Sequence, residues 1–295
     1  MYDIERFHQA VSVEDAIAAL RADESALVIS GGTDVLIQCR EGKLAGCSLV
    51  SVNGLKELQG VTEGPDGEVV IGAATVFSHI TNSPLVRRTM PMLGEAVDQV
   101  GGPQIRNMGT IGGNVCNGVT SADSASSLFA LNAVLELRGG EGTRRVPIAE
   151  FYTGPGKTVR KHDELLVALH IARKDYEGFG GRYLKYGKRG AMEIATLGCA
   201  AMVKLAADKQ TVEELRLAYG VAGPTPLRCH GAEEAARGKA LGAALYDEIA
   251  QCALNETHPR DSWRASKVMR QQLIAEMARR AVQEAAVRAG GKADV

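Results

Sequence analysis

Apolar and polar residues in the first part of the chain follow patterns that predict short strands mixed with short helices. Ala16, Ile17 and Leu20 recur at helical spacing within residues 13–22, and Ser12 precedes them as the expected N-cap. Apolar or β-branched runs predict strands within residues 2–7 and at residues 26–30, 48–52, 134–137 and 165–171. Helical patterns are expected from residue 35 to near residue 42 and at residues 75–81, 92–100 and 123–131.

Two segments between these elements have glycine-rich sequences. The turn signal Gly-Pro-Asp-Gly at residues 64–67 separates residues 60–62 from residues 68–71, which predicts a β-hairpin. Residues 101–114 sustain neither the helical nor the strand period, so we expect a long, ordered, irregular loop there. Such loops are uncommon unless they are functional.

The pattern changes after residue 172. The chain is polar and glycine-rich from Arg173 to Gly181, and we place a domain boundary there, between residues 1–176 and residues 177–295. Beyond it, strands in an antiparallel meander are expected near residues 182–186, 197–205 and 214–221. Residues 263–289 form a long amphipathic pattern that ends at two glycines, which predicts a helix.

Charge and cysteine content exclude several classes of function. The formal net charge of −1 gives no bulk attraction to nucleic acid or to an anionic membrane. The start, MYDIERFHQA, has no signal-peptide pattern, and no apolar run approaches the roughly 20 residues of a membrane span. The six cysteines contain no CxxC pair, and the six histidines show no paired metal-ligand spacing. We therefore expect free thiols in a reducing cytoplasm, and no metal or iron–sulfur cluster on this chain.

The first candidate binding site is Ile-Ser-Gly-Gly-Thr-Asp at residues 29–34, between an expected strand and an expected helix. Without β-carbons, successive backbone N–H groups can point into one concavity at the positive end of the helix, where a pyrophosphate would bind. The segment is not GxGxxG, and it is not a P-loop because no Gly-Lys-Ser/Thr follows. An ordinary turn is the alternative interpretation.

The second candidate site is Gly-Thr-Ile-Gly-Gly-Asn at residues 109–114. It offers closely spaced backbone donors, the hydroxyl of Thr110 and the amide of Asn114. An elaborate surface loop with a helix N-cap at Ser121 or Asp123 is the alternative. A single chain turn would need only one such loop. Two glycine-rich loops could instead clamp a dinucleotide by its pyrophosphate and ribose.

The segments around these loops, SGGTDVLIQ and RNMGTIGGNVCNGVTSADSASSLFAL, resemble the FAD-binding subunits of the molybdenum hydroxylases. That family includes xanthine dehydrogenase, carbon monoxide dehydrogenase and 4-hydroxybenzoyl-CoA reductase. The resemblance covers the whole chain through TGPGKT, RYLKYGKRGAMEIATLG, GVAGPTPLRC and SWRASKVMRQQLI, and is greatest for bacterial xanthine dehydrogenase. The scattered cysteines argue against 4-hydroxybenzoyl-CoA reductase, whose subunits carry an extra cluster on a cysteine-rich loop.

The resemblance implies an α+β fold. Residues 1–176 would form a two-subdomain FAD-binding domain of the vanillyl-alcohol oxidase (PCMH) type, not a Rossmann fold. Residues 177–295 would form an antiparallel sheet with helices, like the carboxyl-terminal domain of carbon monoxide dehydrogenase flavoproteins.

The resemblance also implies which residues bind FAD. The loop residues are Leu27, Val28, Ile29, Ser30, Gly31, Gly32, Thr33 and Asp34 in the first loop, and Gly109, Thr110, Ile111, Gly112, Gly113 and Asn114 in the second. Asp123 and Lys185 would lie near the flavin, and Leu165 or its neighbour Leu166 would pack on the isoalloxazine. The alternatives are a helix N-cap for Asp123, an ordinary core position for Leu165 and a solvated strand face for Lys185.

The implied function is electron relay, with no catalytic side chain for the hydroxylated substrate on this chain. A large molybdenum-binding subunit would oxidise hypoxanthine or xanthine, and a small [2Fe–2S] subunit would pass electrons to FAD here and on to NAD. Molybdopterin and the clusters would lie only on these partners, in a cytoplasmic heterotrimer that could dimerise. The alternatives are the FAD subunit of another molybdenum hydroxylase, acting on carbon monoxide, nicotinate or an aldehyde, and a flavin-free assembly subunit.

Overall fold

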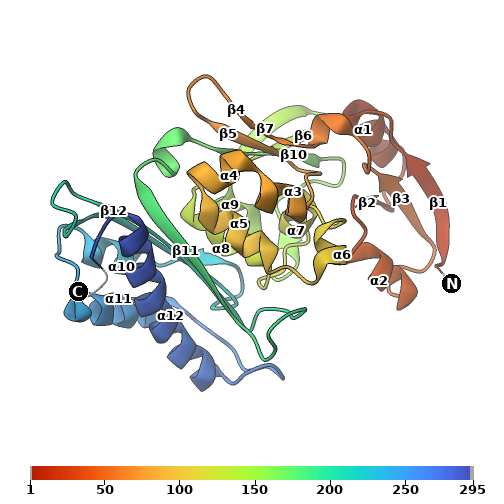
Figure 1. The fold of residues 1–295 in the computed structure, drawn as a ribbon. Helices are drawn as coiled ribbons and strands as arrows, with labels where there is room; N and C mark the ends of the chain where they lie inside the picture. Colours follow the sequence, from red (N-terminus) through yellow and green to blue (C-terminus); the bar gives the residue numbers. More distant parts are fainter. Residues whose placement is uncertain (1, 293–295) are drawn as a thin grey trace.

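The amino-terminal region is a three-stranded parallel sheet with two helices. The structure is a computed structural model that describes residues 2–292, so Met1 and residues 293–295 of the two expected domains lie outside the described residues. The elements are β1 (Ile4–Gln9), α1 (Val13–Ala22), β2 (Ala26–Ile29), α2 (Val35–Arg40) and β3 (Cys47–Ser51). The strands pair in the order β1-β3-β2, at the right-hand edge of the view in Figure 1. The expected cap of α1 is confirmed, because Ser12 Oγ accepts a hydrogen bond from the N–H of Asp15.

A five-stranded antiparallel sheet follows. Its strands are β4 (Val61–Glu63), β5 (Val69–Gly72), β6 (Val134–Gly139), β7 (Gly142–Pro147) and β10 (Leu165–Ile171), in the order β4-β5-β10-β6-β7. The expected hairpin is confirmed as the β4–β5 pair, and the strand expected at residues 165–171 is confirmed as β10. The sequence analysis did not predict β7 or the two-stranded ribbon of β8 (Tyr152–Gly154) and β9 (Lys157–Thr158). Their short polar sequences show no alternation of apolar and polar residues.

Short helices pack beside this sheet. They are α3 (Phe77–Asn82), α4 (Pro84–Thr89), α5 (Pro91–Asp98), α6 (Pro103–Arg106), α7 (Ile111–Cys116), α8 (Asp123–Ala130) and α9 (Ile148–Phe151), with 3₁₀ helices at Lys56–Leu58 and Arg173–Asp175. The irregular loop expected at residues 101–114 is wrong, because α6 and the start of α7 lie there and are too short to show a helical period. The alternative interpretation, with an N-cap at Ser121 or Asp123, is also wrong, because Ala122 holds the cap position of α8.

The carboxyl-terminal region is an antiparallel meander covered by helices. Its elements are β11 (Phe179–Tyr186), β12 (Leu197–Leu205), β13 (Val212–Gly220), β14 (Leu227–Arg228), α10 (His230–Ala236), α11 (Ala243–Glu256) and α12 (Lys267–Arg288). The strands pair in chain order, which confirms the expected meander. The long helix begins at Lys267, later than the expected residue 263, because Ser266 caps it through the N–H of Met269.

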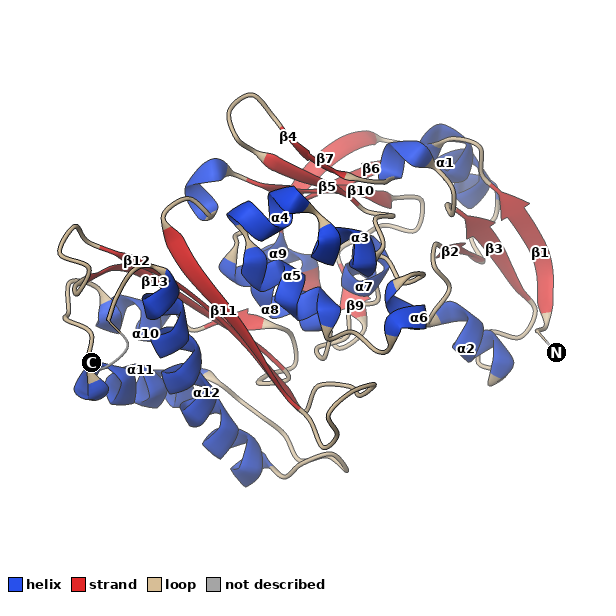
Figure 2. Ribbon diagram, viewed as in Figure 1, coloured by secondary structure: helices blue, strands red, loops and turns tan. Residues whose placement is uncertain are grey.

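The meander has a different core on each of its two faces. Helices α10 and α12 contact one face, whereas α5 and α8 contact the other (Figure 2). Successive residues of β12 therefore alternate between two cores: Cys199 and Ala201 pack with the carboxyl-terminal helices, and Ala200 and Met202 pack with the central helices. Contacts on this second face hold β11 against α5, and β12 and β13 against α8, next to the segment that carries the second glycine-rich loop.

Candidate functional site

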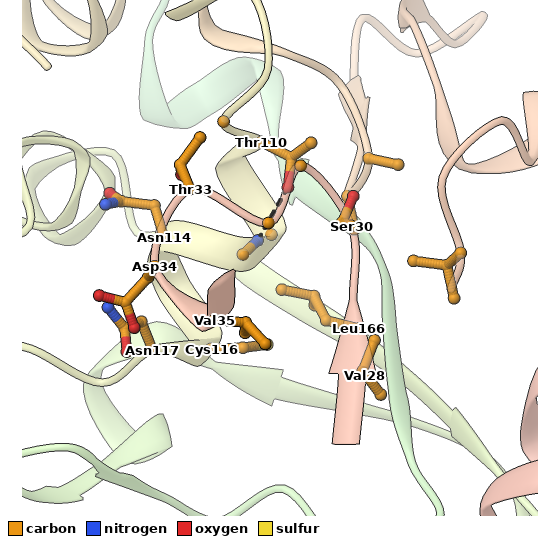
Figure 3. Close-up of a pocket in the computed structure, with 18 of the residues that line it drawn as sticks. Val28, Ser30, Thr33, Asp34, Val35, Thr110, Asn114, Cys116, Asn117 and Leu166 are labelled. Carbon is orange, nitrogen blue, oxygen red and sulfur yellow. Dashed lines mark hydrogen bonds between the residues drawn. The ribbon is translucent and has the colours of Figure 1, made fainter. Parts of the chain in front are cut away.

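The two glycine-rich loops line one cavity of about 380 Å³. Figure 3 labels Ser30, Thr33 and Asp34 of the first loop, and Thr110 and Asn114 of the second, among the residues that line it. The predicted residues in its lining are Leu27, Val28, Ser30, Gly31, Gly32, Thr33, Asp34, Gly109, Thr110, Gly112, Gly113, Asn114 and Leu165. Four predicted residues, Ile29, Ile111, Asp123 and Lys185, are not part of that lining.

The first loop is glycine-rich for two physical reasons. A β-carbon on Gly31 would lie 1.8 Å from the carbonyl oxygen of Met108, so Gly31 allows the two loops to touch. Gly32 has a φ of +69°, a left-handed conformation that side chains other than glycine disfavour. Ile29, the first residue of this loop, does not face the cavity. Its side chain packs in a core with Cys39 and Leu49.

The second loop is the first turn of α7. Thr110 caps this helix, because its Oγ1 accepts a hydrogen bond from the N–H of Gly113 at 3.2 Å. The N–H of Gly112 donates to the carbonyl of Ala73 at 2.8 Å, and a β-carbon on Gly112 would lie 2.6 Å from that oxygen. Gly112 thus packs α7 onto the five-stranded sheet, and Ile111 is fully buried there, while Gly113 faces the cavity.

Polar groups in the lining differ in whether they already have partners. Ser30 Oγ is shielded from solvent and has no hydrogen-bond partner. The amide oxygen of Asn114 accepts a hydrogen bond from Ser124 Oγ at 2.6 Å. The Arg160 guanidinium donates from Nη1 to backbone carbonyls that include that of Glu164, at 2.7 Å. An unpaired buried hydroxyl is costly, so Ser30 marks the place where a ligand would complete the site.

The apolar wall comes from β10. Leu165 and Leu166 both line the cavity and are 3% and 7% exposed, so the structure brings together both candidates for packing on a flat ring. They belong to two separate cores, because neighbouring residues of a strand point to opposite faces. Arg160 and Glu164, just before β10, were missed by the sequence analysis because nothing in their local pattern relates them to loops at residues 29–34 and 109–114.

Asp123 and Lys185 form a closed cluster beside the cavity. Lys185 Nζ lies 2.8 Å from Asp123 Oδ2, and it also donates to the carbonyls of Gln99 and Glu193, each at 2.9 Å. The side chain of Lys185 is only 6% exposed, so the solvated strand face considered for it is wrong. The hydroxyl of Tyr183 donates to Asp123 Oδ1 at 2.7 Å, which makes Tyr183 a third member that the sequence analysis missed.

The electrostatics of this cluster depend on balance between burial and pairing. Burial raises the pKa of the Asp123 carboxyl, while the Lys185 ammonium and the Tyr183 hydroxyl pull it down. Burial raises the pKa of Tyr183 far above its ordinary value, so its hydroxyl remains a donor. The cluster connects to the cavity through Ser124, which follows Asp123 in α8 and bonds Asn114.

All six cysteines are free thiols, and burial raises the pKa of Cys116, in the cavity lining, to about 11. Among residues 2–292, His, Cys, Asp and Glu side chains form no group of three that could hold a metal ion. No helix in the same described part is long and apolar enough to cross a membrane. Two glycine-rich loops, an unsatisfied hydroxyl and an apolar wall are chemistry that fits a flavin dinucleotide.

Comparison with known proteins agrees with this chemistry. Residues 2–173 match the family described as the FAD binding domain in molybdopterin dehydrogenase, and residues 182–285 match the CO dehydrogenase flavoprotein C-terminal domain. A putative xanthine dehydrogenase FAD-binding subunit of Escherichia coli (strain K12) is 44% identical over 99% of both chains.

The chain is also similar over nearly its whole length to a subunit of carbon monoxide dehydrogenase. The medium chain of this enzyme from Hydrogenophaga pseudoflava is 30% identical over 95% of this chain and 96% of its own length. A solved structure of carbon monoxide dehydrogenase from the same organism superposes with a TM-score of 0.92, at 30% identity, over 98% of this chain and 99% of that chain. The whole fold, and not only the cavity, is therefore shared with these relatives.

Proposed function

This chain belongs to the FAD-binding subunits of the molybdenum hydroxylases, and we propose that it serves an enzyme of the xanthine dehydrogenase type. In this role it takes electrons from a [2Fe–2S] subunit and passes them to NAD while a molybdenum-binding subunit oxidises hypoxanthine or xanthine. The observation that carries the proposal is the cavity between two glycine-rich loops, in a chain 44% identical to the Escherichia coli relative and 30% identical to the carbon monoxide dehydrogenase relative.

FAD bound in this cavity would accept single electrons and deliver them in pairs to NAD, which joins one-electron to two-electron chemistry. Gly31, Gly32 and Gly113 line the space where the pyrophosphate would bind, next to the first turns of α2 and α7. Leu165 and Leu166 would exclude water from one side of the ring. Lys185 on β11 and Asp123 on α8 would lie near the ring. No side chain of this chain would act as a general acid or base for the purine.

The proposed assembly places every other cofactor on partner chains. A large molybdenum-binding subunit would hold molybdopterin, and a small subunit would hold the [2Fe–2S] clusters, in a cytoplasmic heterotrimer that can dimerise. Within this chain, residues 1–176 would bind FAD, and residues 177–295 would support β11 and the cluster around Asp123.

Purification of the chain alone and together with its two partner chains tests this function. We expect the isolated chain to carry flavin absorbance without oxidising xanthine, and the complex to reduce NAD in the presence of xanthine. A well-folded chain that retains no FAD would instead support the flavin-free assembly subunit. Turnover of xanthine by the isolated, metal-free chain would contradict the relay role.

A second candidate substrate class rests on the similarity to the carbon monoxide dehydrogenase medium chain. The same complex, assayed with carbon monoxide, nicotinate and an aldehyde in place of xanthine, separates the alternatives. Activity with one of these and none with hypoxanthine or xanthine would retain the FAD relay and replace the purine substrate.

A further inference from the structure

Two loops at the end of β11 display large apolar side chains to solvent. One is the β11–β12 connection, residues 187–196, and the other leads into α12, residues 257–266 (Figure 1). Together with Val268 in the first turn of α12, they form what we call the Trp263 surface, which consists of Lys188, Met192, Ile194, Trp263, Arg264 and Val268. Trp263 is 78% exposed, Met192 and Val268 are 63% exposed and Ile194 is 52% exposed. Exposed apolar side chains that cluster in this way mark sites of contact with other molecules.

Internal hydrogen bonds hold this surface in place. Lys188 Nζ donates to the carbonyl of Trp263, which joins the two loops. Arg270, 2% exposed, extends from α12 and donates to the carbonyls of Thr196 and Ala265 and to Ser262 Oγ, which joins them a second time. An ordered surface loses little conformational entropy when a partner binds, so this arrangement favours recognition.

The edge of the Trp263 surface is positively charged. Its cations are Lys188, Arg189, Arg260, Arg264 and Lys267. Within the described residues, no carboxylate lies at ion-pair distance from Lys188, Arg189 or Arg264, although the chain as a whole has a net charge of −1. The nearby Asp261 carboxylate accepts a hydrogen bond from the N–H of Lys267. An apolar centre with an unpaired cationic edge is complementary to a partner with an apolar centre and an acidic edge.

The ring of Trp263 is not arranged to stack a nucleotide base. The guanidinium of Arg264 lies 4.2 Å from the ring centroid, and Lys188 Nζ lies 5.9 Å from it. Because the π-system already interacts with two cations, a base that stacks on the ring would compete with them. Tryptophan with flanking arginine is instead the composition of protein–protein hot spots.

The Trp263 surface contacts two segments that lie next to the cavity. A β-carbon on Gly102, just before α6, would lie 3.5 Å from Met192 Cγ, so this loop packs beside the second glycine-rich segment. The carbonyl of Glu193 accepts a hydrogen bond from Lys185, which pairs with Asp123. A protein bound to this surface would therefore lie beside the flavin site, where an electron donor has to be.

We propose that the Trp263 surface docks the iron–sulfur subunit that donates electrons, through an apolar and acidic face of that partner. The inference rests on the proposed relay function, because that function requires an iron–sulfur subunit as the electron donor. It adds which face of this chain the donor covers and which residues recognise it.

Binding of the purified full-length chain to the purified complex of its two partner subunits tests the docking. We expect Trp263→Ala, and separately Lys188→Glu with Arg264→Glu, to raise the Kd by roughly 30-fold or more. Flavin content should stay at the wild-type level, because none of these residues lines the cavity. The matched controls are Phe7→Ala, at a position 59% exposed on β1, and Arg6→Glu, and both should leave the Kd unchanged. An unchanged Kd in both surface variants would overturn the proposal.

Photo-crosslinking identifies the partner. With a photoreactive phenylalanine analogue in place of Trp263, the cross-link should form to the iron–sulfur subunit. A cross-link to the molybdenum-binding subunit, to a second copy of this chain or to no protein would overturn the assignment. Neither measurement needs turnover. Oxidation of a substrate other than xanthine would contradict the proposed function, but it would leave this test of docking intact.

Discussion

The cavity between the glycine-rich loops and the Asp123–Lys185 cluster are neighbours, yet they are built in opposite ways. The cavity is lined by two glycine-rich loops and an apolar wall, and Ser30 Oγ has no partner in it. In the cluster, Lys185 Nζ has three acceptors and both oxygens of Asp123 accept hydrogen bonds. One region keeps its hydrogen-bonding capacity for a ligand, whereas the other uses it to fix β11 against α8. Substitutions should therefore change ligand binding in the first region and folding stability in the second.

The largest effect is expected for Lys185→Met. It leaves the buried Asp123 carboxylate without its cation, which typically costs about 3–5 kcal/mol of unfolding free energy. Chemical denaturation of the chain measures the loss. Asp123→Asn combined with Lys185→Met removes both charges and should recover part of it, because the asparagine can still accept from Tyr183. A single variant as stable as the wild type would show that the ion pair does not hold these elements together.

The loss in Lys185→Met should also depend on pH. Burial raises the pKa of Asp123, and without Lys185 only Tyr183 opposes that shift, so the folded-state pKa exceeds the unfolded value. The folded variant then binds more protons than the unfolded chain between these two pKa values, and its stability falls as pH rises through that window. We expect the difference from wild type to be small in acid and largest near neutral pH. The double variant, which lacks the carboxylate, should show no such trend; a trend in it would assign the effect to another group.

Gly112 and Gly113, neighbours in one helix turn, show the same difference between an effect on stability and an effect on ligand binding. Gly112→Val would bring a β-carbon to 2.6 Å from the Ala73 carbonyl oxygen, so it should cost about 1–3 kcal/mol in stability, as overpacking does. A β-carbon on Gly113 would approach only Thr110 Oγ1, at 3.0 Å, so Gly113→Val should keep the fold and lose flavin. Melting temperature and flavin absorbance of the two variants separate these effects. Full flavin content in Gly113→Val would contradict the placement of the cofactor.

Local sequence patterns could predict the strand–turn–helix around Gly31 but not the cluster around Lys185. A glycine turn after an apolar run is visible within ten residues, and the structure has β2, the turn and α2 there. Asp123 and Lys185 meet only because the carboxyl-terminal meander packs on α5 and α8, which no local period encodes. Their pairing with the flavin site came from family resemblance alone. One signal was available: Tyr183 and Lys185 are two apart on a strand, so they share a face, and both reach Asp123.

The expectations that failed did so for similar reasons. Residues 101–114 looked irregular because α6 and α7 have only four and six residues. Glycines at positions 112 and 113 also lower the helical propensity, so tertiary packing on Ala73 and the cap at Thr110 decide the conformation. An aspartate at the start of a helix usually caps it, but Asp123 lies one residue inside α8, and its carboxylate is bound by Tyr183 and Lys185 instead.

The smallest predicted effect tests whether the unpaired Ser30 hydroxyl belongs to a ligand. Ser30→Ala removes a shielded oxygen that has no partner, so the flavin-free protein should be as stable as wild type or slightly more stable. If that hydroxyl bonds the cofactor, the variant should lose about 0.5–1.5 kcal/mol of FAD binding, which is roughly a 2- to 12-fold rise in Kd. Ser127→Ala is the matched control, because Ser127 Oγ is also buried and unpaired but lies outside the cavity lining. It should raise stability in the same way and leave the Kd for FAD unchanged. Titration of the flavin-free variants with FAD measures both constants, and equal affinities for Ser30→Ala and Ser127→Ala would mean that the Ser30 hydroxyl makes no contact with the cofactor.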